Sequence, residues 1–273
     1  MSAPSPTSQT RTPSDARSAV LEVDQVSLAF GGLEVLSGVR FQVDGPELVA
    51  LIGPNGAGKT SVLNCICGIY TPTRGAIRFQ GQSLAGLKPH EIAQRGIART
   101  FQHGELVPHM SVVDNLMVAR HARMRAGLLA QGLFTRRVRD EERAHRLAVE
   151  RVIEFVELER WRHADVAGLP FGLQKVVGFA RALAMEPRLL LLDEPSSGLN
   201  RDERENLARF ILRVRIELGI PMIWVEHDMQ MVSDLADRLV VLAQGRPLAE
   251  GAPDQVLSRP EVVEAYLGRR AVG

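Results

Sequence analysis

Apolar and polar residues alternate near the start of the chain. The alternation covers Leu21–Phe30 and Val35–Val43, and Gly31 and Gly32 separate the two segments. A period of two residues predicts β-strands with one buried face, and paired glycines between such strands predict a turn. We therefore expect two strands joined by a tight turn.

Later segments of the chain are apolar without interruption. They are Leu48–Ile52, Leu189–Leu192, Met222–Val225 and Leu239–Leu242. Short continuous runs are typical of strands that are buried on both faces, as in a parallel sheet covered by helices. Helical segments lie between the last three runs, so the pattern predicts an α/β fold.

The other predicted elements are short strands or helices. Strands are expected at Ala76–Phe79 and Gly96–Thr100, and a helix from about Lys59 to Cys67. From Ser111 to about Glu159 the pattern becomes mainly helical, and its apolar residues there predict one buried helix face. That face would contain Ala144, Ala148, Val152, Phe155 and Val156. We expect a helical insertion in the α/β core at about residues 103–185.

Length and charge narrow the possible classes of protein. The chain has 273 residues, with 33 Lys and Arg against 32 Asp and Glu, which gives no support for a nucleic-acid partner. No apolar run approaches the roughly 20 residues that cross a bilayer. Residues 1–18 are rich in Ser, Thr and Pro. We expect a disordered tail at 1–18, a short C-terminal tail at 269–273, and a soluble, cytosolic protein.

A glycine-rich motif, GPNGAGKT, follows the strand predicted at Leu48–Ile52 and fits the pattern G-x-x-x-x-G-K-[ST]. Between a strand and a helix, such a loop points backbone N–H groups at a polyphosphate. Lys59 would reach the β- and γ-phosphates, and the hydroxyl of Thr60 would bind Mg²⁺. The expected nucleotide-binding residues here are Gly53, Pro54, Asn55, Gly56, Ala57, Gly58, Lys59, Thr60 and Ser61.

Two carboxylates, Asp193 and Glu194, end the strand predicted at Leu189–Leu192. Beside a phosphate loop, Asp193 can lie near Mg²⁺, usually through water, and Glu194 can polarise the attacking water. Each motif alone has a simpler explanation, a glycine-rich loop before an ordinary helix or a strand that ends in surface acids. Together they predict that the chain binds a nucleoside triphosphate.

With these motifs, residues 19–268 resemble the ATP-binding subunit of an ABC transporter. The resemblance implies a P-loop NTPase core with an antiparallel β subdomain and a helical insertion subdomain, and ATP and Mg²⁺ as cofactors. Phe30 resembles the aromatic residue that stacks on adenine, although a core aromatic is the alternative. Gln102 resembles the glutamine that touches Mg²⁺ and water, and His227 the switch histidine at the γ-phosphate. The implied catalytic residues are Lys59, Gln102, Glu194 and His227, and the implied metal ligands are Thr60, Gln102 and Asp193.

The chain departs from this family in the signature, which usually reads LSGGQ. The corresponding residues are Leu169, Pro170, Phe171, Gly172 and Leu173. Pro170 replaces the serine that would donate to a γ-phosphate in a partner subunit, and proline has no N–H to substitute. Gly172 keeps its N–H, and the following helix keeps its positive end, so the segment can still face a phosphate. An inactive half-site is the alternative, which we disfavour because the catalytic residues are all present.

The segment from Ser197 to Asn200 resembles the loop through which one subunit senses the other's site, although Asn200 also suits a helix N-cap. The resemblance implies a head-to-tail pair with a second ATP-binding subunit, identical or related. It also implies two membrane permease subunits, contacted near Gln102 and the helical insertion. The resemblance further implies an external solute-binding protein. It also implies a peripheral location on the cytoplasmic side of the inner (plasma) membrane.

A narrower resemblance points to importers of branched-chain amino acids and related solutes. It depends on the Leu-Pro-Phe-Gly variant, the stretch Arg-Thr-Phe-Gln-His, the basic helical insertion and the ending Pro260–Gly268. Relatives in that branch handle hydrophobic amino acids, urea or short amides, and small carboxylic acids. A soluble ABC ATPase acting on nucleic acid or ribosomes, and a regulatory subunit with little turnover, remain open as alternatives.

Overall fold

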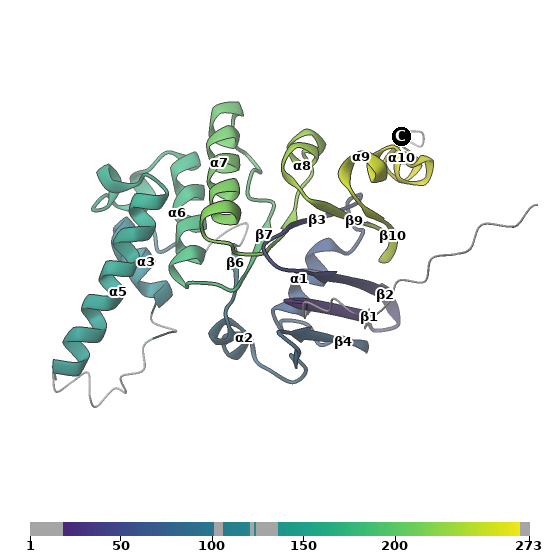
Figure 1. Ribbon diagram of the computed structural model, residues 1–273, viewed down its shortest axis with the longest axis horizontal. Coiled ribbons are helices and arrows are strands. Elements are labelled where there is room, and N and C mark those ends of the chain that lie inside the picture. The colour runs from purple at the N-terminus through teal and green to yellow at the C-terminus, as the bar shows by residue number, and fades with distance from the viewer. Residues whose placement is uncertain (1–18, 101–105, 121–122, 124–135, 268–273) are drawn as a thin grey trace, which may run out of the picture.

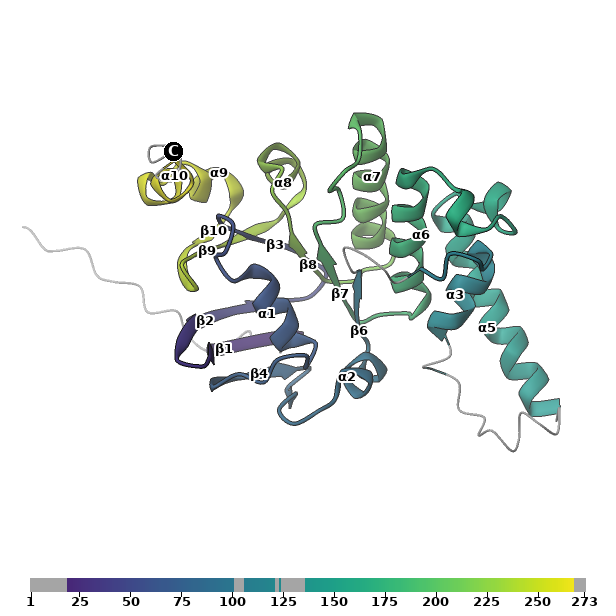
Figure 2. The same ribbon diagram turned by 180° about the vertical axis from the view of Figure 1, so that it is seen from behind.

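The computed structural model describes residues 19–100, 106–120, 123 and 136–267, and its strands form two sheets (Figures 1 and 2). The strands are β1 (Leu21–Phe30), β2 (Leu33–Val43), β3 (Leu48–Ile52), β4 (Arg74–Phe79), β5 (Gln82–Ser83), β6 (Ile97–Thr100), β7 (Leu189–Asp193), β8 (Met222–Val225), β9 (Arg238–Ala243) and β10 (Arg246–Gly251). The helices are α1 (Lys59–Ile66), α2 (Pro89–Arg95), α3 (Val112–Arg120), α5 (Arg136–Phe155), α6 (Phe171–Ala184), α7 (Arg201–Glu217), α8 (Met229–Leu235), α9 (Pro253–Leu257) and α10 (Pro260–Leu267).

The smaller sheet is antiparallel, in the order β2-β1-β4-β5. Burial alternates along most of β1, as the sequence pattern predicts. Its partner β2 begins at Leu33, two residues before the predicted start at Val35. The reason is the turn, because Phe30 already pairs with Leu33 and the two glycines between them, at φ 52° and 88°, complete the turn by themselves. Two-residue hairpin turns favour glycine for this reason.

The larger sheet has the order β10-β9-β3-β8-β7-β6, and all neighbouring strands except β10 and β9 are parallel. Every residue of β3, β7 and β8 is buried. Along β7, Leu190 and Leu192 pack in the core beneath the helices, whereas Leu189 and Leu191 pack in the core shared with α1 and the smaller sheet. The strands therefore lie between two apolar layers, which confirms the predicted α/β fold.

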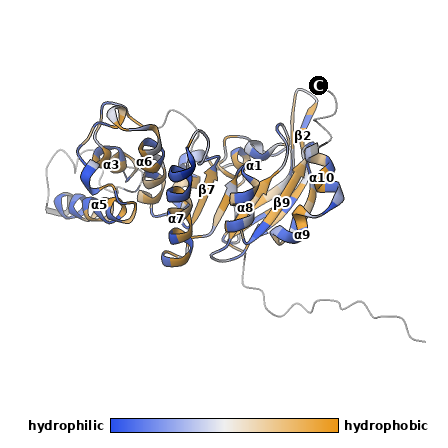
Figure 3. Cartoon of the chain, turned by 90° about the horizontal axis from the view of Figure 1, so that it is seen from above, coloured by the Kyte–Doolittle hydropathy of each residue, from blue (hydrophilic) through white to orange (hydrophobic). Residues whose placement is uncertain are grey.

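Helices α3, α5 and α6 pack together at one end of the larger sheet (Figures 1 and 2). The predicted buried face of α5 is partly wrong, because Ala144 is exposed and the buried positions include His145, Val149 and Ile153. The buried histidine is tolerated because the Nε of Arg120 donates to its Nδ1 at 2.9 Å. The solvent side of α5 is strongly hydrophilic, whereas β7 and β9 are largely hydrophobic (Figure 3).

Several short elements were not expected from the sequence pattern, among them α2 and the C-terminal β10, α9 and α10. Pro247 lies within β10, and the pairing with β9 shifts register between Pro247 and Ala249. Proline is tolerated there because β10 is an edge strand, where one side of the backbone needs no partner. The apolar pattern is too short and interrupted in these elements to predict them.

The largest fully buried side chain, Trp224, lies on β8 between β3 and β7. We expect Trp224→Ala to lower the free energy of unfolding by about 3–5 kcal/mol, because it leaves a cavity in the core. Urea denaturation would measure the change. Ile216→Ala on α7, where the side chain is 72% exposed, is the control and should change stability by less than about 0.5 kcal/mol. Equal effects of the two substitutions would contradict this description of the core.

Candidate active site

The phosphate loop joins β3 to α1, and its shape depends on two glycines with positive φ. At Gly53, with φ 149°, a Cβ atom would lie 2.1 Å from the carbonyl oxygen of Leu242. At Gly58, with φ 97°, it would lie 2.5 Å from a methyl carbon of Leu36. Neighbouring strands therefore pack directly against this loop, and larger residues would push it away from them.

Lys59 is the first residue of α1, and its ammonium group points back into the loop. Its Nζ donates to the carbonyl oxygens of Gly53 at 2.7 Å and Pro54 at 3.2 Å. Burial lowers the pKa of Lys59, and the carboxylates of Glu194 and Asp193 oppose that shift. The side chain is thus a buried cation that faces two acids. A cation in this place is suited to bind phosphate oxygens.

Glu194 and His227 meet directly, although they follow different strands. The Nε2 of His227 lies 2.5 Å from the Oε1 of Glu194. Glu194 follows β7 with φ 46°, a left-handed conformation, and its backbone N–H donates to the oxygen of Val225 at 2.9 Å. Such a conformation costs a non-glycine residue about 1–3 kcal/mol and is found mainly at functional sites. The turn after β7 directs the carboxylate towards the end of β8.

Asp193 is the last residue of β7, and its side chain is 3% exposed. Its Oδ2 accepts from the Nη2 of Arg99 at 2.6 Å, while its Oδ1 is buried and makes no hydrogen bond with the described residues. Arg99 was not expected at the site. In the sequence, Arg99 is only a basic residue in the short strand Ile-Ala-Arg-Thr, and nothing nearby indicates that it pairs with Asp193.

A cavity of about 250 Å³ brings most of the predicted catalytic groups together. Its lining consists of Val35, Asn55, Gly56, Ala57, Gly58, Lys59, Thr60, Ser61, Glu194 and His227. Phe30 lies outside this lining and is 48% exposed, so it is not the core aromatic of the alternative. Its ring contacts Tyr70 edge to face, with centroids 5.0 Å apart. Gln102 lies outside the described residues.

The signature residues 169–173 do not line this cavity. Pro170 is the N-cap residue of α6. The N–H groups at the start of a helix have no acceptor within the helix, so the missing N–H of proline costs no helical hydrogen bond there. Phe171 is 50% exposed and packs over Gly198, and the ammonium of Lys175 lies 5.5 Å from its ring centre. Asn200 is the N-cap of α7, as its spacing suggests, since its side chain accepts from the N–H of Glu203.

Two more buried groups adjoin the site. Burial raises the pKa of the Glu226 carboxyl to about 7, and the backbone N–H of His227 opposes that shift. Burial also raises the pKa of the Tyr266 phenol to about 12, and the backbone of Gly53 opposes it. Tyr266 thus brings the C-terminal helix α10 close to the phosphate loop, a contact between distant segments that the sequence does not suggest.

A family model described as "ABC transporter" matches residues 36–197, which contain the phosphate loop, the signature and the acidic end of β7. The chain belongs to the ABC transporter family. A second model, "Branched-chain amino acid ATP-binding cassette transporter", matches residues 241–272 of this ABC cassette. The cassette is an ATP-binding, ATP-hydrolysing subunit of an ABC importer. The alternative of a non-transport ABC ATPase is not supported.

Curated relatives resemble the cassette over nearly its whole length. The high-affinity branched-chain amino acid transport ATP-binding protein BraF of Pseudomonas aeruginosa is 41% identical, over 91% of this chain and 98% of BraF. The protein of the same description named LivG in Escherichia coli K12 is 40% identical, with the same coverage. The ADP conformation of MJ1267, an ABC transporter cassette of solved structure, is 28% identical with a TM-score of 0.80, over 92% of this chain and 99% of that one.

Among its described residues, the ABC cassette has no helix long and apolar enough to span a membrane. The same residues contain no cluster of three or more His, Cys, Asp or Glu side chains that could hold a metal ion.

The backbone of Gly172 lies against Glu203, whose carboxylate accepts from the N–H of Asn200. A Cβ at Gly172 would lie 2.3 Å from the Oε1 of Glu203. We expect Gly172→Ala to displace Glu203 and weaken the cap of α7, at a cost of about 0.5–2 kcal/mol in the free energy of unfolding. Chemical denaturation would measure this cost.

Gly178, on the same helix, has open space around its Cβ position and provides the matched control. Gly178→Ala should stabilise the cassette by up to about 1 kcal/mol, because alanine favours a helix. In a Glu203→Ala background, Gly172→Ala should lose most of its cost. An undiminished cost in that background would show that the carboxylate is not the obstacle.

Proposed function

We propose that this cassette powers the uptake of branched-chain or other hydrophobic amino acids, or of a related small solute, through separate membrane subunits. The observation that carries the proposal is the match of residues 241–272 to the model for branched-chain amino acid cassettes, which is narrower than the general match at 36–197. BraF and LivG, whose names describe the same transport, support it. An external solute-binding protein would select the solute, and the cassette would act at the cytoplasmic side of the inner membrane.

The triphosphate would lie in the cavity between the phosphate loop and the ends of β7 and β8. The loop amides and the N-terminus of α1 favour its negative charge. Lys59 would exchange the carbonyl oxygens of Gly53 and Pro54 for phosphate oxygens. Phe30, exposed and in edge-to-face contact with the half-buried Tyr70, offers an aromatic surface for the adenine.

The residues at the end of β7 fit a magnesium ion, which would neutralise phosphate charge when bound. The buried Oδ1 of Asp193 has no hydrogen-bond partner among the described residues and is suited to accept from a metal-bound water. Thr60 is among the residues that line the cavity. We propose Thr60, Asp193 and Gln102 as the residues that hold Mg²⁺.

Glu194 would accept a hydrogen bond from the attacking water and draw a proton from it as the γ-phosphate is transferred. The imidazole of His227 lies beside that carboxylate and fixes its orientation. With the triphosphate bound, the Nε2–H group of His227 can be shared between Glu194 and a γ-phosphate oxygen. The two side chains then act as one unit, because each is held by the other.

A second ATP-binding subunit, identical or related, would complete each site. Within one chain the signature residues 169–173 lie outside the cavity, while Phe171 and the N-terminus of α6 face solvent. We propose that this surface faces the phosphates held by the partner. The backbone N–H groups after Pro170 and the positive end of α6 would replace the missing serine.

We expect Glu194→Gln to retain ATP binding while ATP hydrolysis falls about 10²–10⁴-fold, because the amide cannot accept the proton. In cells that lack this chain and express the variant, uptake of radiolabelled leucine, isoleucine and valine should fail, whereas the wild-type chain should restore it. Glu142→Gln, which changes an exposed acid of α5 outside the cavity and the groove, is the control and should restore uptake. Restored uptake of urea or a small carboxylic acid, without any amino acid, would contradict the proposed solute.

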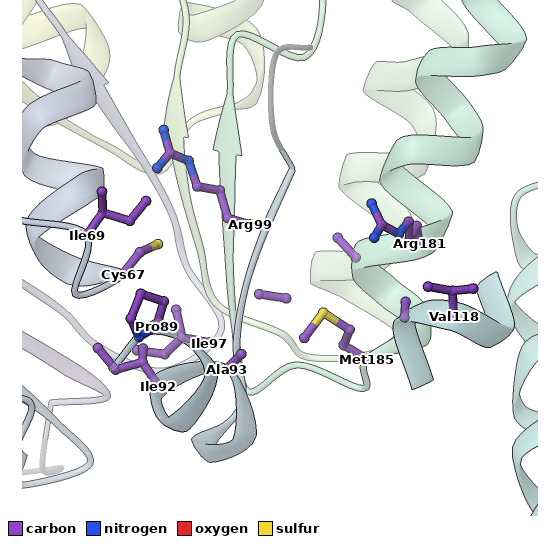
Figure 4. A pocket seen from close by; sticks show the side chains of 13 residues that line it. Cys67, Ile69, Pro89, Ile92, Ala93, Ile97, Arg99, Val118, Arg181 and Met185 are labelled. Carbon is purple, nitrogen blue, oxygen red and sulfur yellow. The ribbon is translucent and has the colours of Figure 1, made fainter. Parts of the chain in front are cut away.

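The membrane subunits would contact a groove of about 280 Å³ between the α/β core and the helical insertion (Figure 4). Ile69 and Ile92 line it on the core side, and Val118 and Met185 on the helical side. Ile69 and Val118 are 46% and 41% exposed, so apolar surface faces solvent there. The groove lies next to β6, whose end leads into the segment of Gln102. We propose that an apolar segment of one permease subunit packs into this groove.

We expect Val118→Glu to abolish co-purification with the permease subunits, because a charge would be buried in an apolar contact. Nucleotide affinity of the isolated cassette should stay within about twofold of wild type, since Val118 lies outside the nucleotide cavity. The control is Leu147→Glu on α5, where the side chain is 60% exposed and away from the groove. Intact complexes with Val118→Glu, or loss of complexes with the control, would refute this docking site.

A further inference from the structure

Arg99 joins groups from separate elements beneath the nucleotide cavity. One guanidinium nitrogen, Nη2, donates to the Oδ2 of Asp193 at 2.6 Å, and the other, Nη1, donates to the Oδ1 of Asn64 at 2.7 Å. The side chains of Arg99 and Asp193 are 6% and 3% exposed. Removing both charges from water costs free energy that their attraction can fail to recover. We therefore look for a role of this ion pair other than stabilising the fold.

Asn64 connects Arg99 to α1, the helix that also carries Thr60. It lies on α1 four residues after Thr60, and residues four apart are neighbours on one face of a helix. Asp193, at the end of β7, is the other described residue proposed to hold Mg²⁺. The rigid fork of the guanidinium therefore spans the two elements that carry Thr60 and Asp193.

The contact also selects one oxygen of the carboxylate. Because Arg99 occupies Oδ2, the Oδ1 of Asp193 is left without a hydrogen-bond partner among the described residues. A carboxylate held in this way cannot rotate freely. Its second oxygen is therefore fixed in place, where it can accept a hydrogen bond from a water molecule bound to the metal. Groups that orient a ligand from behind typically change metal affinity about 10–100-fold when they are removed.

Arg99 also forms part of the wall of the groove between the core and the helical insertion. Figure 4 shows its side chain rising from β6 above Ala93 and Ile97, on the side of the groove towards Cys67 and Ile69. A single side chain thus contacts the metal-side carboxylate at one end and lines the proposed docking groove along its stem.

We propose that Arg99 is a positioning residue that sets the distance between Asp193 and the Thr60 end of α1. The proposal rests on the metal assignment made for the proposed function.

The test uses Arg99→Lys, which keeps the charge but has a single ammonium that cannot hold both partners as the fork does. Mn²⁺ serves as the probe, because its binding is followed directly by electron paramagnetic resonance without turnover. Affinity for ADP is measured in parallel, with Mn²⁺ and with EDTA. We expect Mn²⁺ affinity in the presence of ADP to fall about 10–100-fold, while ADP affinity in EDTA stays within about twofold.

Arg120→Lys is the matched control, because Arg120 is also buried and also pairs with a carboxylate, that of Glu186, in the helical part. It should lower the melting temperature without changing Mn²⁺ affinity. Asn64→Ala, which removes the other branch of the fork, should weaken Mn²⁺ binding in the same direction as Arg99→Lys.

Two results would overturn the proposal in different ways. Unchanged Mn²⁺ affinity in Arg99→Lys, with the wild-type cassette binding Mn²⁺ with ADP, would show that Arg99 is only structural and would leave the proposed function standing. A wild-type cassette whose ADP affinity does not respond to Mn²⁺ would refute the metal assignment and the positioning role together.

Discussion

The site depends on neighbouring parallel strands that end at the same level of one sheet. Val225 on β8 pairs with Leu51 on β3 and with Asp193 on β7. The residues that follow are therefore delivered to one edge: the phosphate loop after β3, Glu194 after β7 and His227 after β8. Because parallel strands are held by evenly spaced hydrogen bonds, a shift of one strand would move its residues out of the site.

Burial makes this register specific and also sets the electrostatics of the site. A slip of one of these strands between the two apolar layers would carry the charged residues that follow it into the apolar core, at a high cost in free energy. Their ends carry charged groups that are only partly solvated, so each needs a partner: Lys59 faces the loop carbonyls and two acids, Asp193 is held by Arg99, and Glu194 by His227. A nucleotide with its metal can replace some of these contacts, which is why they lie where phosphate charge would enter.

Much of the fold and of the site was predictable, because a local sequence motif is enough to specify the backbone conformation of that segment. The phosphate loop, the acidic end of β7 and the buried strands could be read from residue order alone, since glycine placement and continuous apolar runs are local properties. The face of α5 could not be predicted correctly, because the burial of His145 depends on Arg120, 25 residues earlier. Arg99 was missed for the same reason, because its partners Asn64 and Asp193 lie 35 and 94 residues away in the chain.

The sequence by itself determined the α/β class, the phosphate loop and the identity of the acids that follow the sheet strands. Only the tertiary structure decided which oxygen of Asp193 is left without a hydrogen-bond partner among the described residues, that Glu203 lies against Gly172, and that β6 forms a groove with α3 and α6. The physical reason is the range of the interactions. Backbone conformation and strand burial follow from neighbouring residues, whereas side-chain pairing and grooves depend on segments that meet only when the chain has folded.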